Sequence, residues 1–360
     1  MKYAKDSQRI TWQHIVLTSL CVVLALILFV MIFATTYIHH LLGLITNNGD
    51  EYLNATMSSE DLATFGDLPD ESTPITGPSV DHSDVTQSTL PSTPVEQLKT
   101  EGVINIMLIG EDRRPYETKR QRSDSMILCS INTKKNTITL ISFLRDIYIS
   151  NIPGYGPEKL NAAYAVGGVK CLEQTLAAYF GVHVDAAVAV DFNGFTQIID
   201  MLGGVSIELT KAEANHLNSP KYADVYGSDI QTVHAGMNHL DGKTALAYSR
   251  IRKLDWDAKR TERQRNVITA LINAYKNKGL AEMAFLASDI LSTGFIKTDM
   301  SQDEVLSYVR SLFPMLSSAT INTQQIPANG TFESMNVGNV TDCKVVDLAV
   351  NRQILKNILQ

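Results

Sequence analysis

A long uncharged stretch near the N-terminus constrains this chain more than any other feature. Between Arg9 and Asp50 there is no charged residue, if histidine is counted as neutral, and residues 15–38 are almost continuously apolar. This apolar run of about 24 residues exceeds the roughly 20 that a helix needs to cross a bilayer. A cleaved signal peptide is the alternative, but its apolar region is about 7–15 residues long. The sequence therefore predicts a transmembrane helix at residues 14–38.

The charges on the two sides of the predicted helix indicate its orientation. Lys2, Lys5 and Arg9 precede the apolar stretch, whereas the first charged residues beyond it are acidic. Basic residues stay preferentially on the cytoplasmic side of a membrane. We therefore expect residues 1–13 to be a cytoplasmic tail and the rest of the chain to lie outside. The protein is predicted to be a single-pass type II protein of the cell membrane.

A segment of unusual composition follows the predicted helix. Residues 39–98 contain five prolines, many serines and threonines, ten acidic residues and no lysine or arginine. Such a composition buries too little apolar surface to offset the entropy lost on ordering. Proline and like charges also keep a chain extended. The segment is predicted to be a disordered extracellular linker that holds a folded domain, residues 99–360, away from the membrane.

Composition excludes several classes of protein for this domain. The whole chain carries a net charge of −7, but residues 99–360 hold 28 basic and 27 acidic residues. A general nucleic-acid-binding domain needs a large positive charge and is excluded. Cys129, Cys171 and Cys343 lack metal-site spacing, so they are expected to be buried thiols, with one disulfide as the alternative. No Gly-x-Ser-x-Gly motif or histidine triad indicates a covalent serine or cysteine enzyme.

The order of apolar patterns predicts an α/β domain. Short β-rich runs occur at residues 104–109, 125–132, 137–143, 186–190 and 205–209. Helical spacing occurs at residues 168–180, 195–202 and 261–277. A further helix at residues 244–248 is expected to run into a strand near Arg250. Strands interleaved with helices favour an α-β-α sandwich around a central mixed β-sheet.

Arginine is concentrated in four places along this domain. Ten of the thirteen arginines lie there: Arg113, Arg114, Arg120 and Arg122, then Arg145, then Arg250 and Arg252, and finally Arg260, Arg263 and Arg265. The planar guanidinium group binds phosphate through two parallel hydrogen bonds, which lysine cannot do. Two arginines two apart on a strand, or three apart on a helix, are expected to share a face. The clustering therefore indicates a phosphate site, although any single arginine could be an ordinary surface residue.

Two aspartates stand among these arginines. Asp112 directly follows the first predicted strand, and Asp124 directly precedes the second. Magnesium bound with phosphates is held by one or two carboxylates, substrate oxygens and water. Aspartate is also common in turns and helix caps, which is the ordinary alternative. We expect Asp112 and Asp124 to hold Mg²⁺, or Mn²⁺ in its place.

Five segments, in this order, resemble the LytR-CpsA-Psr family of bacterial cell-envelope proteins. They are residues 108–115 (LIGEDRRP), 122–168, 190–209, 240–253 (LDGKTALAYSRIRK) and 260–271 (RTERQRNVITAL). The resemblance covers nearly all of residues 102–280. It implies a Mg²⁺-assisted phosphotransferase of Gram-positive bacteria, which attaches an anionic glycopolymer such as teichoic acid or capsule to peptidoglycan. The donor would be a polyprenyl-diphosphate carrier, with its tail in an apolar tunnel.

The resemblance also implies roles for individual residues. Asp112 and Asp124 would hold the metal. The diphosphate would be bound by eight side chains, Arg114, Arg122, Arg145, Arg250, Arg252, Arg260, Arg263 and Gln264. Arg122, Arg145 and Asp146 are the catalytic candidates, where Asp146 either orients Arg145 or acts as the base. Arg113, and the lack of a glycine before Arg260, depart from the usual pattern and bear on substrate preference.

Two other functions use the same residues. A diphosphatase would cut the same bond with water and is distinguished only by a product that forms without an acceptor. An envelope sensor or attenuator would bind the lipid-linked precursor without chemistry. The short cytoplasmic tail offers no DNA-reading element, and the presence of both aspartates and all the arginines argues against a non-catalytic binder. The transferase is therefore the preferred interpretation.

Overall fold

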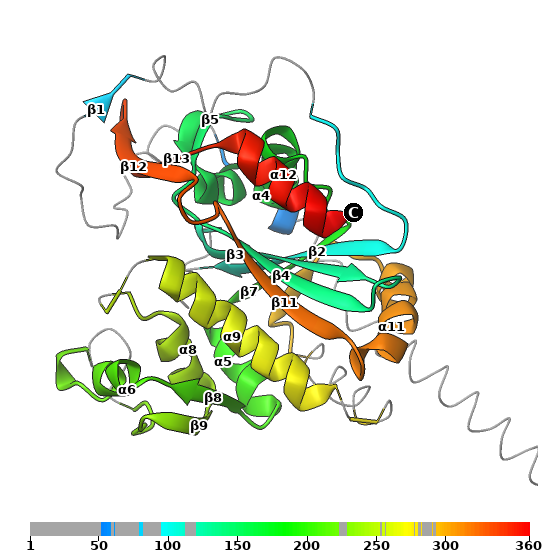
Figure 1. Ribbon diagram of the computed structural model, residues 1–360, viewed down its shortest axis with the longest axis vertical. Coiled ribbons are helices and arrows are strands. Elements are labelled where there is room, and N and C mark those ends of the chain that lie inside the picture. Colours follow the sequence, from blue (N-terminus) through cyan, green and yellow to red (C-terminus); the bar gives the residue numbers. More distant parts are fainter. Residues whose placement is uncertain are drawn as a thin grey trace, which may run out of the picture. The chain divides into compact units, whose positions relative to one another are not determined.

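The computed structural model (Figure 1) describes the folded domain and two short pieces that precede it. The described residues are 52–58, 61, 79–81, 95–111, 120–222, 229–252, 254–255, 257–276, 278–279, 282, 290 and 293–360. All belong to the second of the two units into which the chain divides, residues 46–360. The predicted cytoplasmic tail and transmembrane helix lie outside the described residues, as do Asp112, Arg113 and Arg114. Within the described part, no helix is long and apolar enough to cross a membrane.

Six strands form the central sheet in the order β10-β7-β2-β3-β4-β11. Their bounds are β2 (Val103–Glu111), β3 (Ser123–Asn132), β4 (Thr137–Phe143), β7 (Ala186–Asp191), β10 (Ile296–Thr298) and β11 (Thr320–Ile326). The strands β2, β3 and β4 are antiparallel neighbours. Parallel pairing adds β7 to β2 and β11 to β4, and β10 closes one edge antiparallel to β7. The predicted mixed sheet is confirmed.

Alternating side chains of this sheet enter two apolar cores on opposite faces. On β2, Met107 and Ile109 belong to one core, while Ile106 and Leu108 pack against the other, as the period of two in a strand requires. Two helices close each core, first α4 (Leu160–Phe180) and α12 (Leu348–Leu359), then α9 (Asp257–Tyr275) and α11 (Gln302–Leu316). The predicted α-β-α sandwich is therefore confirmed (Figure 1).

Smaller elements extend both faces. A third core lies between α9 and a hairpin with three helices, β8 (Val205–Leu209), β9 (Gly236–Leu240), α5 (Phe192–Met201), α6 (Lys211–Leu217) and α8 (Gly242–Ser249). The remaining strands are β1 (Ser79–Val80), β5 (Tyr148–Ile152), β6 (Gly156–Lys159), β12 (Phe332–Val337) and β13 (Val340–Val346). They form a β5-β6 hairpin and a sheet in the order β1-β12-β13. A 3-10 turn, η2 (Pro220–Tyr222), follows α6. The helix α9 contributes side chains both to the core below the sheet and to the third core.

Two predicted elements differ from the structure. The helix predicted from residue 168 begins at Leu160, and Gly167 and Gly168 interrupt it with non-helical backbone angles. The first turns of α4 were not predicted because these glycines break the helical pattern of the sequence. The strand predicted near Arg250 is wrong, since α8 ends at Ser249 and Arg250 caps it with φ −100° and ψ 0°. Arg250 and Arg252 therefore do not share a strand face.

Part of the predicted linker is built into the domain. Leu53 has no exposed surface and belongs to the core between the sheet and α4. The Met57 amide donates a hydrogen bond to the Val166 carbonyl at 2.8 Å. The prediction of disorder rested on the average composition of residues 39–98, which hides the short apolar pattern of residues 52–57. This segment departs from the expected linker.

Candidate functional site

Three arginines converge on the carboxylate of Asp124. Its Oδ1 atom lies 2.7 Å from Nη1 of Arg145, 3.7 Å from Nη1 of Arg260 and 3.8 Å from Nη2 of Arg252. Asp124 lies near the start of β3, and the arginines follow β4, open α9 and follow α8. Arg260 also donates to the Asp124 carbonyl at 3.3 Å. The structure thus brings three of the four arginine clusters to one end of the sheet.

The charge of these arginines keeps Asp124 ionised. Burial alone would raise the pKa of Asp124, but Arg260, Arg145 and Arg252 outweigh burial and hold that pKa below its ordinary value. All three ion pairs are made by Oδ1. Among the described residues, the side-chain hydrogen bond to this carboxylate is also made to Oδ1. Asp124 therefore gathers the three arginines at one carboxylate oxygen.

A lysine that the spacing of arginines does not reveal joins this site. Lys159 ends β6 with only 2% of its surface exposed, and its Nζ lies 3.9 Å from Oδ1 of Asp146. The same Oδ1 atom lies 3.5 Å from Nε of Arg145. Lys159 stands in the 122–168 segment quoted for the family resemblance, which is the signal that could have found it. Four cations, Lys159, Arg145, Arg252 and Arg260, thus gather around the carboxylates of Asp124 and Asp146.

The position of Asp146 favours orientation of Arg145 over proton transfer. Its side chain is 7% exposed and lies between the Arg145 and Lys159 cations. The Lys344 amide donates to the Asp146 carbonyl at 2.7 Å, and the Asn161 amide donates to the Arg145 carbonyl at 3.2 Å. The backbone carbonyl groups of Arg145 and Asp146 are thus both held by hydrogen bonds. The Asp146 carboxylate therefore lies where it can hold the Arg145 side chain.

Arg122 lies at the edge of the same corner. Its Nη2 atom is 3.6 Å from Oε2 of Glu158, the neighbour of Lys159 on β6. The Arg122 side chain is mostly buried, at 18% exposure. Arg122 directly precedes β3 and lies two residues before Asp124. Its ion pair with Glu158 connects the Arg122 side chain to β6.

Arg250 and Arg252 occupy different surroundings. The Arg250 guanidinium lies 4.6 Å from the centre of the Phe192 ring, at the start of α5. Arg252 instead reaches Asp124. The expectation of a shared face relied on a strand, and the helix cap at residue 250 turns the two side chains apart.

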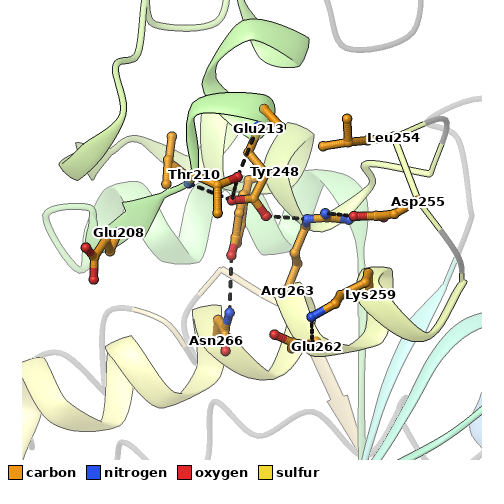
Figure 2. A pocket seen from close by; sticks show the side chains of 12 residues that line it. Glu208, Thr210, Glu213, Tyr248, Leu254, Asp255, Lys259, Glu262, Arg263 and Asn266 are labelled. Atoms are coloured by element: carbon orange, nitrogen blue, oxygen red, sulfur yellow. Dashed lines mark hydrogen bonds and ion pairs between the residues drawn. The ribbon is translucent and has the colours of Figure 1, made fainter.

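Arg263 does not reach the cluster around Asp124. It donates from Nε to Glu213 at 2.7 Å and forms a two-pronged ion pair with Asp255, with 2.9 Å between Nη1 and Oδ1. Burial would lower the pKa of Arg263, but Asp255 and Glu213 outweigh burial and raise it. These groups line a cavity of about 560 Å³ on the other side of α9 (Figure 2). Arg263 therefore ties α9 to α6 and to the loop after α8.

Gln264 lies on the same side of α9 as Arg260. Residues four apart lie one turn above each other on a helix, so Gln264 follows Arg260 along the helix. Its Oε1 atom is buried and has no hydrogen-bond donor among the described residues. Buried polar atoms are normally paired. The amide of Gln264 is thus available to a ligand held by the arginines.

The predicted thiols are confirmed, whereas the metal ligands remain a prediction. Cys129, Cys171 and Cys343 are free, and burial raises the pKa of Cys129 to about 12. In the described part of the chain, no group of three or more histidine, cysteine or acidic side chains could enclose a metal ion. Asp112 lies outside that part. A metal with few protein ligands, which borrows oxygens from its substrate, still fits Asp124.

The fold and site together define a class of protein. Arg145, Arg252 and Arg260, gathered at one carboxylate in an α/β domain with a mixed sheet, make a site suited to a phosphate group. The chain belongs to the LytR_cpsA_psr family, whose model matches residues 75–356. The family that the resemblance indicated is thus confirmed.

Named relatives agree with this assignment. Over 246 residues the chain is 32% identical to "Polyisoprenyl-teichoic acid--peptidoglycan teichoic acid transferase TagU" of Oceanobacillus iheyensis, covering 66% of this chain and 70% of the relative. A solved structure described as "TagT bound to LIIa-WTA" matches 79% of this chain and 98% of its own, with 26% identity and a TM-score of 0.57. A second solved structure is described as "LytR-CPS2A-psr family protein YwtF (TagT) with bound octaprenyl pyrophosphate lipid". It matches 76% of this chain and 97% of its own, with 25% identity and a TM-score of 0.54.

Proposed function

We propose that this protein transfers an anionic glycopolymer, such as teichoic acid, from a polyprenyl-diphosphate carrier to peptidoglycan. The observation that carries the proposal is the convergence of Arg145, Arg252 and Arg260 on one oxygen of Asp124, because such a group of guanidinium groups suits a diphosphate. The relative named as a teichoic acid transferase and the similar structure with bound octaprenyl pyrophosphate support the same chemistry. The activity is a polyprenyl-diphosphate glycopolymer phosphotransferase, of class EC 2.7.8.-.

The reaction exchanges one phosphorus–oxygen bond for another. A hydroxyl oxygen of peptidoglycan attacks the phosphorus next to the glycopolymer, a phosphodiester forms, and the phosphoanhydride bond to polyprenyl phosphate breaks. The hydroxyl proton leaves to water or to the departing phosphate. Negative charge on the phosphoryl oxygens is stabilised by positioned cations. Arg145, Arg252 and Arg260 serve this role beside Lys159 and Arg122, and Asp146 holds Arg145 in place.

Mg²⁺, or Mn²⁺, completes the proposed site. Asp124 and Asp112 would hold the ion. Asp112 directly follows Glu111 and Asp124 directly follows Ser123, and Glu111 and Ser123 pair across β2 and β3. The bound ion would supply positive charge for the phosphoryl oxygens. Arg114, Arg250 and Gln264 are proposed to contact the diphosphate or its flanking groups. Arg263 is proposed to hold α9 in place through its ion pairs with Glu213 and Asp255.

The proposed location follows from the predicted N-terminal helix. A single-pass type II anchor at residues 14–38 places the domain outside the cell membrane, where lipid-linked polymer and peptidoglycan meet. The partners are thus the polymer carrier, the acceptor glycan and the membrane. Nucleic acid is not among them.

Transfer in a defined mixture tests this proposal. The full chain is mixed with a polyprenyl-diphosphate-linked polymer, Mg²⁺ and a peptidoglycan acceptor, and the product is analysed by mass spectrometry. The proposal predicts a polymer–phosphate–acceptor product that disappears when the acceptor is omitted. A polymer phosphate formed equally well without acceptor would instead establish the diphosphatase. Wild-type transfer by the Asp124→Asn variant would contradict the site.

A further inference from the structure

Arg265 is a buried arginine that the proposed reaction does not use. On α9 it stands in a stripe of residues that faces the sheet, formed by Thr261, Arg265, Ile268 and Ile272. Ile268 and Ile272 pack against the apolar core between the sheet and α9 (Figure 1). With 6% of its surface exposed, Arg265 thus occupies a position where the helix otherwise presents apolar side chains to the sheet.

The hydrogen-bond partners of Arg265 are two hydroxyl groups, which carry no charge. Its Nη1 atom donates to Oγ of Ser142 on β4 at 2.7 Å, and to Oγ1 of Thr261, one helical turn earlier, at 3.5 Å. Its Nε atom is buried and finds no acceptor among the described residues. In the same part of the chain Arg265 forms no ion pair. The described residues therefore bury this charge without a counter-ion.

The surroundings of Arg265 are the opposite of those of Arg263. Burial lowers the pKa of Arg265 below its ordinary value, and Glu262 offsets only part of this effect. For Arg263, the carboxylates of Asp255 and Glu213 outweigh burial and raise the pKa. A buried charge without a partner is strongly unfavourable. An anionic ligand beside Arg265 would supply the charge that the described residues do not.

The Ser142 hydroxyl offers a further donor at the same place. Its oxygen accepts the hydrogen bond from Arg265, and its hydrogen is donated to no acceptor among the described residues. Ser142 has only 1% of its surface exposed. A hydroxyl group can accept and donate at the same time. Arg265 and Ser142 therefore present both a charge and a hydroxyl donor to an anion.

Arg265 lies close to the cluster around Asp124. On α9 it follows Arg260 by five residues, which correspond to about 7.5 Å along the helix axis. Its partner Ser142 precedes Arg145 by three residues, which span about 11 Å at most. Arginine side chains are themselves several ångströms long. The two places are therefore near enough to contact the neighbouring phosphates of one diphosphate.

We propose that Arg265, with Ser142, forms an inner subsite for the phosphate that stays on the polyprenyl chain. The inference rests on the proposed function, because it divides the diphosphate between two places. The arginines around Asp124 hold the phosphate that the acceptor attacks, which must remain open to the acceptor. Beyond Arg265 the stripe continues with Ile268 and Ile272, so the inner end suits the phosphate that carries the apolar chain. Arg265 thereby stabilises the negative charge of the departing polyprenyl phosphate.

Two substitutions of Arg265 separate charge from packing. Arg265→Met replaces the guanidinium group with an apolar side chain that can follow the same stripe, and Arg265→Lys keeps the charge but not the planar fork. Arg252→Met is the comparison for the outer phosphate. Lys259→Ala is the matched control, since it removes an exposed cation from the same helix.

The measurement is binding of two probes to the full chain in detergent by isothermal titration calorimetry. Geranylgeranyl phosphate carries the inner phosphate only, whereas geranylgeranyl diphosphate carries both. A lost hydrogen bond between charged groups typically weakens binding about 10- to 100-fold. Arg265→Met should weaken both probes by this factor, and Arg265→Lys should weaken them less. Arg252→Met should weaken the diphosphate more than the monophosphate, and Lys259→Ala should change neither by more than about twofold.

Urea unfolding of the ligand-free protein tests the alternative that Arg265 is merely structural. Replacement of an uncompensated buried charge by an apolar side chain should not lower the urea midpoint. A midpoint for Arg265→Met that falls as far as that for Arg263→Met would overturn the proposal. So would an unchanged affinity of Arg265→Met for the monophosphate, because Arg265 would then not hold the inner phosphate.

The unmodified protein separates this inference from the proposed function. If it binds neither probe, the proposed function fails and the inner subsite fails with it. If it binds both probes and Arg265→Met binds them equally well, only the inner subsite is overturned. Equal losses in Lys259→Ala would also overturn the inner subsite, since they would show an effect of charge without position.

Discussion

Two clusters of arginine and carboxylate lie along one helix, and they differ in charge balance. Around Asp124, three arginines share a single carboxylate oxygen. Around Arg263, a single guanidinium faces the two carboxylates of Glu213 and Asp255. Both clusters are largely buried, so neither can leave its charge to the solvent. The gathering of several arginines at one carboxylate oxygen suits the first to an anionic ligand, whereas in the second one arginine is paired with two carboxylates.

Removal of Arg263 should have the largest effect on stability. Arg263→Met leaves two mostly buried carboxylates without their cation, which typically costs about 3–5 kcal/mol of the free energy of unfolding. Urea denaturation of the purified domain at neutral pH measures this. A loss below about 1 kcal/mol, the level of an exposed pair, would show that the two clusters do not differ as described.

Removal of Arg252 should affect transfer instead. Its side chain is 25% exposed and lies 3.8 Å from an Asp124 carboxylate that Arg145 and Arg260 also approach, so Arg252→Met should leave the free energy of unfolding nearly unchanged. Loss of one group that stabilises transition-state charge typically lowers kcat about 100- to 1000-fold. Transfer kinetics beside urea denaturation give both values. If Arg252→Met unfolds the protein while the folded fraction keeps its rate, the assignment of this cluster is wrong.

Asp124 should stabilise the ligand-free protein in a pH-dependent way. Its pKa is lower in the folded than in the unfolded state, so its contribution is present above about pH 4 and is lost as the pH falls through the folded-state pKa. Asp124→Asn should therefore cost about 1–3 kcal/mol near neutral pH. The difference from the unmodified protein should shrink in acid. A difference that grows as the pH falls would contradict the cause given for the pKa.

An exposed pair on the same helix should matter least. Lys259 and Glu262 lie 2.8 Å apart with about half of each side chain exposed. Such pairs contribute about 0–1 kcal/mol, so Lys259→Ala should change stability little and transfer not at all. Thermal unfolding and the transfer assay provide the check. A large loss of transfer would mean that cations on α9 act by general charge and not by position.

Much of the fold could be predicted because its signals are local. Alternating apolar residues in β2, β3 and β4, and the helical spacing of α9, depend on a few neighbouring residues. The strand near Arg250 was predicted wrongly because Ser249-Arg250-Ile251-Arg252 has the alternation of a strand, while the preceding helix α8 decides its backbone.

The site was harder to predict because it depends on partners distant in sequence. The arginines could be found by type, but spacing alone cannot separate Arg260, which faces Asp124, from Arg263, which faces Glu213. Three residues turn a helix by about 300°, so the two side chains lie only about 60° apart, and elements distant in sequence decide which carboxylate each one meets. The folded segment at residues 52–58 was not predicted because its partners, Arg120 and Gly168, lie more than sixty residues further along the chain.

The central claim is that the arginines gathered around Asp124 hold a polyprenyl diphosphate. The most direct test is to purify the protein and its Arg252→Met and Lys259→Ala variants, and to measure bound polyprenyl phosphate or diphosphate by mass spectrometry. We predict that the unmodified protein and Lys259→Ala retain the lipid and that folded Arg252→Met loses it. Equal lipid on all three, or folded unmodified protein that neither carries the lipid nor binds it when added, would contradict the claim.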